Sequence, residues 1–83
     1  MSKYKPSRLR KVREFMKKGI LTKREREVFE LLIQNYTTIE IADKLKISDK
    51  TVRNHISNAM QKLGVKGRAG AVIELLRLGE LSL

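Results

Sequence analysis

Apolar residues return at three- and four-residue intervals in five stretches of the chain, a spacing that places them on one face of a helix. The pattern predicts an all-α fold of four helices over residues 21–83, preceded by an additional helix within residues 1–20. In the first of the four, Val28, Leu31 and Leu32 are expected to form the buried face. The predicted helices span about residues 7–19, 22–34, 38–45, 49–63 and 68–78.

Residues with strong preferences for helix ends stand at several of these boundaries. Thr22 is followed three residues later by a glutamate, which is the pattern of a capping box. Thr37 is expected to start the next helix, and Ser48 can cap the one after it. Gly64 and Gly79 fit the left-handed position at which helices commonly end.

The two helices in the middle of the chain are separated by only a short turn at residues 46–48. Ala42 is small enough for their backbones to approach closely, so the first helix can cross the second at a steep angle. This arrangement is a helix-turn-helix, whose second helix can lie in the major groove of DNA. The residues expected at the contact are Ile41, Ala42, Leu45, Ile47, Val52 and Ile56.

Positive charge is concentrated on two segments of a chain whose formal net charge is +10. Residues 1–20 carry eight Lys or Arg against one Glu, and residues 44–68 carry seven against one Asp. The segments between and after them are slightly acidic, at net −2 and −1. The distribution indicates a polyanionic partner that meets the predicted second helix and the N-terminal segment.

The composition argues against several other classes of protein. With no cysteine and a single histidine, the 83 residues lack the usual ligands of zinc sites and the usual nucleophile pairs. No apolar run approaches the roughly 20 residues that cross a bilayer, and the first residues do not resemble a signal peptide. We therefore expect a cytoplasmic protein that is not an enzyme and needs no cofactor and no small-molecule ligand.

Several separated motifs, in register over residues 21–78, resemble the DNA-binding domain of the LuxR/FixJ/NarL regulators. They read Leu21-Thr22-x-Arg24-Glu25-x-Glu27-Val28, Glu40-Ile41-Ala42, Ile47-Ser48-x-x-Thr51-Val52-x-x-His55 and Lys62-Leu63-x-Val65-x-x-Arg68-x-x-Ala71-Val72.

The run from Lys50 to Arg68 and the ending Glu74-Leu75-Leu76-Arg77-x-Gly79-Glu80-Leu81 look most like stand-alone family members of spore-forming bacilli. The resemblance implies a homodimeric regulator, without a receiver or ligand domain, that binds promoter DNA and touches RNA polymerase where it activates. It further implies activation and repression late in sporulation, in the mother cell, including genes for spore coat proteins. Two features depart from the family: the long basic segment 1–20, and Tyr36 in a turn where glycine is common.

On a second helix capped at Ser48, Arg53, Asn54 and Ser57 fall opposite the apolar face. Arg53 can donate two hydrogen bonds to guanine, and Asn54 can pair with the edge of adenine. The family pattern implies that these three residues contact bases; the alternative is a solvated polar face. His55 is interpreted as a half-buried residue in preference to a DNA contact.

Phosphate contacts are expected at both ends of the predicted helix-turn-helix. Lys50 and Thr51 match the family's phosphate-binding positions, and Lys62, Lys66 and Arg68 form a cationic exit from the helix that can approach the DNA backbone. Three of the candidates have competing roles. The threonines at 37 and 38 can cap a helix, and Lys62 can be merely solvated. Arg24 or Arg26 is a further, weaker possibility beside surface ion pairs. The expected set is Thr37, Thr38, Lys50, Thr51, Lys62, Lys66 and Arg68.

The last predicted helix carries more apolar residues than one face of a small core requires, so part of it is interpreted as a partner surface. The family resemblance favours a two-fold contact between copies of the chain, although these residues can also complete the core. A dimer would place two reading helices about one DNA turn apart. The expected interface residues are Val72, Ile73, Leu76 and Leu78.

Three interpretations compete for residues 1–20: a helix packed on the domain or on the second subunit, an arm that grips phosphates, or a membrane-surface helix. Packing combined with nonspecific phosphate attraction is favoured because the apolar face is small.

For the whole chain, the nearest alternative is a sigma-factor region-four module, which would copurify with core polymerase without DNA. A basic RNA-binding protein is more distant, since the four aromatic residues are scattered and form no stacking platform.

Overall fold

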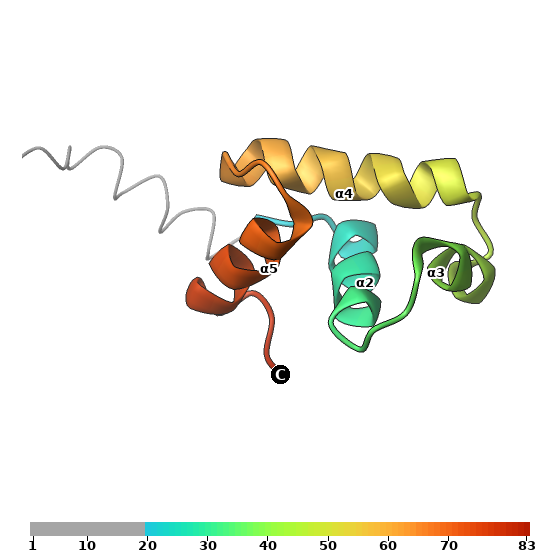
Figure 1. Ribbon diagram of the computed structural model, residues 1–83, viewed down its shortest axis with the longest axis horizontal. Coiled ribbons are helices and arrows are strands. Elements are labelled where there is room, and N and C mark those ends of the chain that lie inside the picture. Colours follow the sequence, from blue (N-terminus) through green and yellow to red (C-terminus); the bar gives the residue numbers. More distant parts are fainter. Residues whose placement is uncertain (1–19) are drawn as a thin grey trace, which may run out of the picture.

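The computed structural model describes residues 20–83, which fold into four helices (Figure 1). Their positions agree with the predicted helices to within two residues at every end. The basic helix expected before them lies outside the described residues. Within residues 20–83, no helix has both the length and the apolar character needed to cross a bilayer. The helices are α2 (Lys23–Leu32), α3 (Thr38–Leu45), α4 (Asp49–Leu63) and α5 (Arg68–Arg77).

The first three of these helices begin at the predicted capping residues. The hydroxyl of Thr22 accepts from the backbone amide of Glu25 at 3.1 Å, and the Glu25 carboxylate accepts from the Thr22 amide at 2.9 Å. Thr37 and Glu40 form the same reciprocal pair, at 3.1 and 2.8 Å. Ser48 caps α4 by accepting from the backbone amide of residue 51 at 3.0 Å. Each cap satisfies amides that would otherwise lack a partner at a helix start.

The turn between α3 and α4 depends on a left-handed residue. Lys46 ends α3 with φ of 58°, and the amide of Ile47 then bonds the carbonyl of Ala42 at 3.0 Å. This geometry reverses the chain within three residues. Gly64 ends α4 in the same way, with φ of 70°, as its sequence position predicts.

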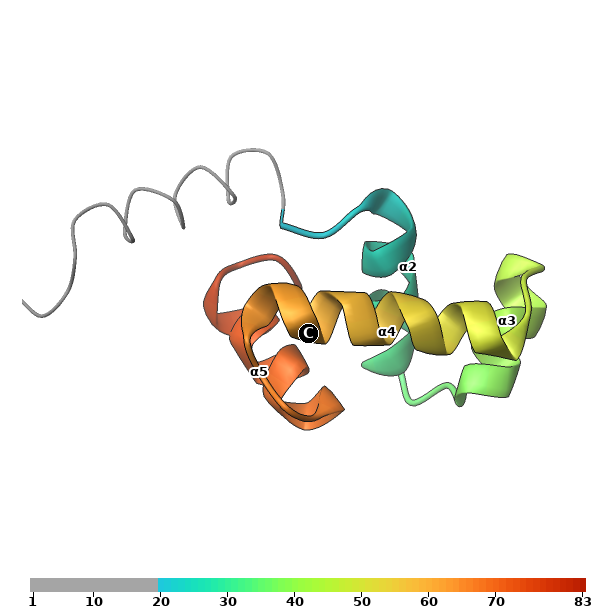
Figure 2. The same ribbon diagram turned by 90° about the horizontal axis from the view of Figure 1, so that it is seen from above.

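Helix α4 spans the domain and contacts α2, α3 and α5 (Figure 1). α3 lies against its N-terminal half, α5 lies near its C-terminal end, and α2 lies between them. Figure 2 looks down on α4 with the other helices beneath it, so its outer face is left uncovered by the helices of residues 20–83. The fold therefore supports a long helix from one side and presents the other side outward.

The core differs from the predicted one in α2. Val28 and Phe29 are fully buried there, whereas Leu31 and Leu32 are only half-buried against the core. The prediction was right for Val28 but missed Phe29: the buried residues of α2 are Glu25, Val28 and Phe29, so the centre of the inward face lies to one side of Leu31 and Leu32. The buried apolar residues are Leu21, Val28, Phe29, Ile41, Ala42, Val52, Ile56, Ala59, Ala71, Leu75 and Leu81.

Two ion pairs with nearly buried carboxylates join distant parts of the chain. Lys62 near the end of α4 donates to Glu25 in α2 at 2.6 Å, and the Glu25 side chain is only 4% exposed. Arg26 donates to the carboxylate and to the backbone carbonyl of Glu80, each at 2.7 Å. Since an unpaired buried carboxylate is costly, these contacts hold α2 against α4 and against the C-terminal segment.

Candidate nucleic-acid interface

The α3–turn–α4 unit is a helix-turn-helix whose packing determines which face of α4 is free. Ile41 and Ala42 of α3 are buried, as are Val52 and Ile56 of α4. These residues form the inner side of the unit. The exposed residues on the opposite side of α4 are polar or charged, so no other part of the domain is needed to cover them. The inner contacts therefore aim the outer face of the second helix away from the domain.

The residues expected to contact bases lie together on this outer face. Arg53, Asn54 and Ser57 are all exposed, and Lys50 is exposed one turn before them. At 3.6 residues per turn, these four positions fall within about 100° of arc around the helix. They form a polar strip that is narrow enough to enter a DNA groove together. Their presence on one exposed face agrees with the expected arrangement.

Arg53 also has a partner that the sequence analysis did not consider. Its guanidinium donates to a carboxylate oxygen of Asp49, four residues earlier on the same helix. Asp49 was interpreted only as an acid that favours the positive end of the helix dipole. An acid and a base at i,i+4 spacing would have indicated the pair, because such residues are neighbours on a helix surface.

The candidate phosphate contacts divide into groups at the two ends of α4. Lys50 and Thr51 stand at its start, where the Thr51 hydroxyl lies 2.8 Å from that of Ser48. Lys66 and Arg68 are exposed beyond its end. Cations therefore lie before and after Arg53 along the chain: Lys50 at the start of α4, and Lys66 and Arg68 beyond its end.

Of the remaining polar candidates, Thr37 and Lys62 have partners within the domain, and Thr38 and His55 are partly covered. Thr37 uses its hydroxyl to cap α3, and Thr38 is half-buried. The ammonium of Lys62, expected at a phosphate, instead lies between the Glu25 carboxylate at 2.6 Å and the Ile20 carbonyl at 3.3 Å. His55 is half-buried, in line with its preferred interpretation. We therefore leave Lys62 out of the interface because its charge is used inside the domain.

The apolar residues of α5 serve two surfaces. Ala71 and Leu75 are fully buried in the core, and Val72 and Leu76 pack half-buried against it. Ile73 is 55% exposed in the single chain. Of the expected interface residues, Ile73 is thus the exposed one, Val72 and Leu76 are half-buried within about 100° of it on the same helix, and Leu78, half-buried, follows the end of α5.

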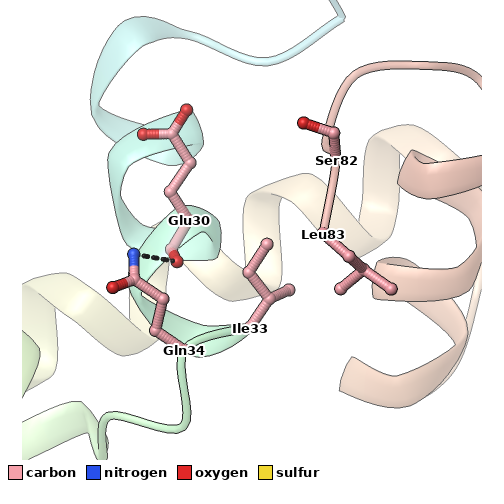
Figure 3. A pocket seen from close by; sticks show the side chains of 5 residues that line it. All are labelled: Glu30, Ile33, Gln34, Ser82 and Leu83. Atoms are coloured by element: carbon pink, nitrogen blue, oxygen red, sulfur yellow. Dashed lines mark hydrogen bonds between the residues drawn. The ribbon is translucent and has the colours of Figure 1, made fainter.

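A hollow of about 380 Å³ lies on another part of the molecule, between the end of α2 and the C-terminal segment. Figure 3 shows the side chains of Glu30, Ile33, Gln34, Ser82 and Leu83 around it. The only hydrogen bond drawn there runs from the Gln34 amide to the Glu30 carbonyl, at 3.0 Å. The end of α2 points away from α4 (Figure 1), so this hollow does not belong to the polar strip.

A helix-turn-helix with an exposed basic second helix defines a DNA-binding protein. The chain belongs to the luxR family of bacterial regulatory proteins, whose family model matches residues 19–75. It is a DNA-binding transcription regulator, and the resemblance predicted from its motifs is confirmed.

Known relatives match most of the chain. It is 74% identical to the spore germination protein GerE of Bacillus subtilis over 73 residues, which are 88% of this chain and 99% of that protein. It is 47% identical over 60 residues to the transcriptional regulatory protein DegU of Brevibacillus brevis, covering 72% of this chain but 25% of DegU.

A solved structure of the transcription factor GerE superposes with a TM-score of 0.75 at 66% identity, covering 77% of this chain and 96% of that one. The all-α helix-turn-helix fold predicted from the sequence is therefore confirmed. The match at this identity also favours the luxR-type interpretation over the sigma-factor alternative.

Proposed function

We propose that this chain is a sequence-specific regulator that reads promoter DNA by inserting the outer face of α4 into the major groove. The observation that carries the proposal is the exposed strip of Arg53, Asn54 and Ser57 opposite a fully packed inner face. Arg53 donates to O6 and N7 of guanine, Asn54 pairs with N6 and N7 of adenine, and Ser57 contacts either kind of base.

Phosphate contacts fix the position of α4 in the groove without reading sequence. Lys50 and Thr51 hold the backbone at the start of the helix, while Lys66 and Arg68 hold it beyond the end. The start of α3 approaches the same strand through the backbone amide of Thr38, at the positive end of the helix dipole. The Thr37 amide already donates to Glu40, but the Thr37 hydroxyl, which accepts from Glu40, can still donate its own hydrogen to a phosphate. Lys50, Lys66 and Arg68 are all exposed, which supports their assignment as phosphate contacts.

The active form is a homodimer that associates through α5. Ile73, with Val72 and Leu76 beside it and Leu78 just after the helix, forms an isologous contact, in which the same surface is used by both copies. The exposure of Ile73 supports this assignment, because burying such a side chain against a second copy is favourable. The two α4 helices then lie about one turn of DNA apart and select a pseudo-palindromic site.

The regulated genes belong to sporulation. The support is the 74% identity to a protein named for spore germination, over nearly its whole length, together with the resemblance to stand-alone regulators of spore-forming bacilli. The chain acts in the cytoplasm of the mother cell, on the nucleoid, late in sporulation. It activates some promoters and represses others, including those of spore coat genes.

At activated promoters the bound dimer touches RNA polymerase. The acidic residues Glu27, Glu30 and Glu40 are the candidates for this contact, since most of the basic surface is used by DNA. Glu30 and Glu40 are exposed, whereas Glu27 forms an ion pair with Arg24 at 3.0 Å. Charge reversal at Glu27 or Glu30 should lower activation without lowering promoter occupancy. Glu40 also forms the capping box of α3, so it is tested by Glu40→Gln, which removes the charge and can keep the box.

Selection of bound sites from a random duplex library at physiological salt tests the reading function. The wild-type chain should enrich an inverted repeat, and Arg53→Ala and Asn54→Ala should each relax particular positions in it. Gln34→Ala is the matched control because this exposed residue lies at the far end of α2. If no motif emerges and all four proteins bind alike, the charge acts generically and the proposal is wrong.

A further inference from the structure

The carboxylate of Asp49 is held at the start of α4 with its two oxygens in different surroundings. Oδ2 accepts a hydrogen bond from Nη1 of Arg53. Oδ1 is buried and has no hydrogen-bond partner within the described part of the chain. The Asp49 side chain is 32% exposed, against 56% for Arg53. One oxygen of the carboxylate is therefore shielded from solvent without a hydrogen bond, and the other pairs with an exposed guanidinium.

Arg53 belongs to the polar strip proposed to read DNA, and Asp49 lies at the edge of that strip. Asp49 precedes Arg53 by four residues, so the two side chains meet along the surface of α4. A guanidinium has five N–H donors in a fixed plane, and the carboxylate engages one nitrogen of that plane. Donors remain free on the rest of the plane, enough for the paired acceptors on the edge of a guanine.

We propose that Asp49 is a positioning residue that determines how strictly Arg53 discriminates guanine from other bases. The proposal rests on the reading function proposed above. Asp49 restricts the guanidinium to few orientations, so that a guanine at one position in the site meets preoriented donors. Other bases present no matching pair of acceptors at that place.

Charge neutralisation is the second part of the effect. On DNA without the matching guanine, Arg53 stays with Asp49, and the pair contributes no net charge towards phosphates. A free arginine would instead move to a nearby phosphate and strengthen binding to any sequence. Asp49 thus weakens nonspecific binding more than specific binding, and the ratio between the two increases.

The test measures affinities of the full chain for three duplexes: the site enriched in the selection, the same site with the guanine read by Arg53 replaced, and an unrelated sequence. Asp49→Asn keeps the size of the side chain and removes its charge. It should lower the ratio between the first two affinities by about threefold or more, part of the value of one bidentate contact. It should also bind the unrelated duplex more tightly. The salt slope, which is the change in log K with log salt concentration, should be steeper by about 0.9.

Three further variants separate positioning from other effects. Asp49→Glu can still pair with Arg53 at the same spacing, so it should retain most of the discrimination. In an Arg53→Ala background, Asp49→Asn should leave the ratio unchanged. Glu30→Gln adds the same charge at the end of α2, away from the strip, and controls for net charge.

A purely structural role for Asp49 would give a different pattern. If Asp49→Asn lowers the melting temperature but leaves the ratio and the salt slope unchanged, the residue only stabilises the start of α4 and the inference is wrong. Equal changes in Asp49→Asn and Glu30→Gln would also overturn it. If the wild-type chain enriches no motif, the proposed reading function fails first, and this inference fails with it.

Discussion

Replacement of Lys62 by methionine tests whether this lysine serves the domain or the DNA. The substitution removes the ammonium that lies 2.6 Å from Glu25 and keeps most of the side-chain length. Removing one partner of a fully buried pair costs about 3–5 kcal/mol because the other charge is left unpaired. Here the Glu25 side chain is 4% exposed and that of Lys62 is 36% exposed, so solvent compensates part of the loss.

Glu25 also keeps its hydrogen bond from the Thr22 amide at 2.9 Å. We therefore expect Lys62→Met to lower the free energy of unfolding by about 2 kcal/mol, below the fully buried range. For a domain of this size, that corresponds to a fall in melting temperature of about 8–16 °C. Thermal and urea denaturation followed by circular dichroism measures both quantities.

Two controls make the interpretation specific. Glu25→Gln preserves a capping box without the charge, so in that background Lys62→Met should cost less than about 0.5 kcal/mol. Lys66→Met removes an exposed lysine that forms no ion pair within residues 20–83 and should leave stability nearly unchanged.

DNA binding separates the two roles of Lys62. Below its melting temperature, Lys62→Met should retain the wild-type salt slope, whereas Lys66→Met should lower it by about 0.9. A stable Lys62→Met protein with a reduced slope would refute the structural role and restore Lys62 to the phosphate contacts.

Other parts of the molecule give three further predictions. Ile73→Asp should weaken binding to an inverted repeat by roughly tenfold or more while leaving a single half-site unaffected, as measured by gel shift; equal loss on both duplexes would argue against an α5 dimer. Gly64→Ala, at φ of 70°, should cost about 1 kcal/mol of unfolding free energy. Gly70→Ala lies inside α5, where the new Cβ would meet only an ordinary contact of 3.5 Å to Val65, so it should instead raise stability by about 0.5–1 kcal/mol; thermal melts in which both variants shift alike would contradict the assigned cap. Deleting residues 1–18 should weaken binding and flatten its salt dependence, while selection from a random library should return the same motif; a changed motif would show that this segment reads sequence.

Local interactions explain why the helix boundaries and the exposed polar face of α4 could be predicted from the sequence. The capping boxes at Thr22 and Thr37 join residues three apart, and the cap at Ser48 does the same. The arc shared by Arg53 and Asn54 follows from the helix period alone. Such features do not depend on how the helices later pack, so the chain determined them by itself.

Only the tertiary structure decided which residues the packing brings together. Lys62 meets a carboxylate 37 residues earlier, and Arg26 meets Glu80 across 54 residues. The angle at which α2 passes under α4 buries Phe29 fully and Leu32 only in part. Periodicity identifies an apolar face to within a residue or two, but the crossing of two helices selects its centre and the charges that end up beside it.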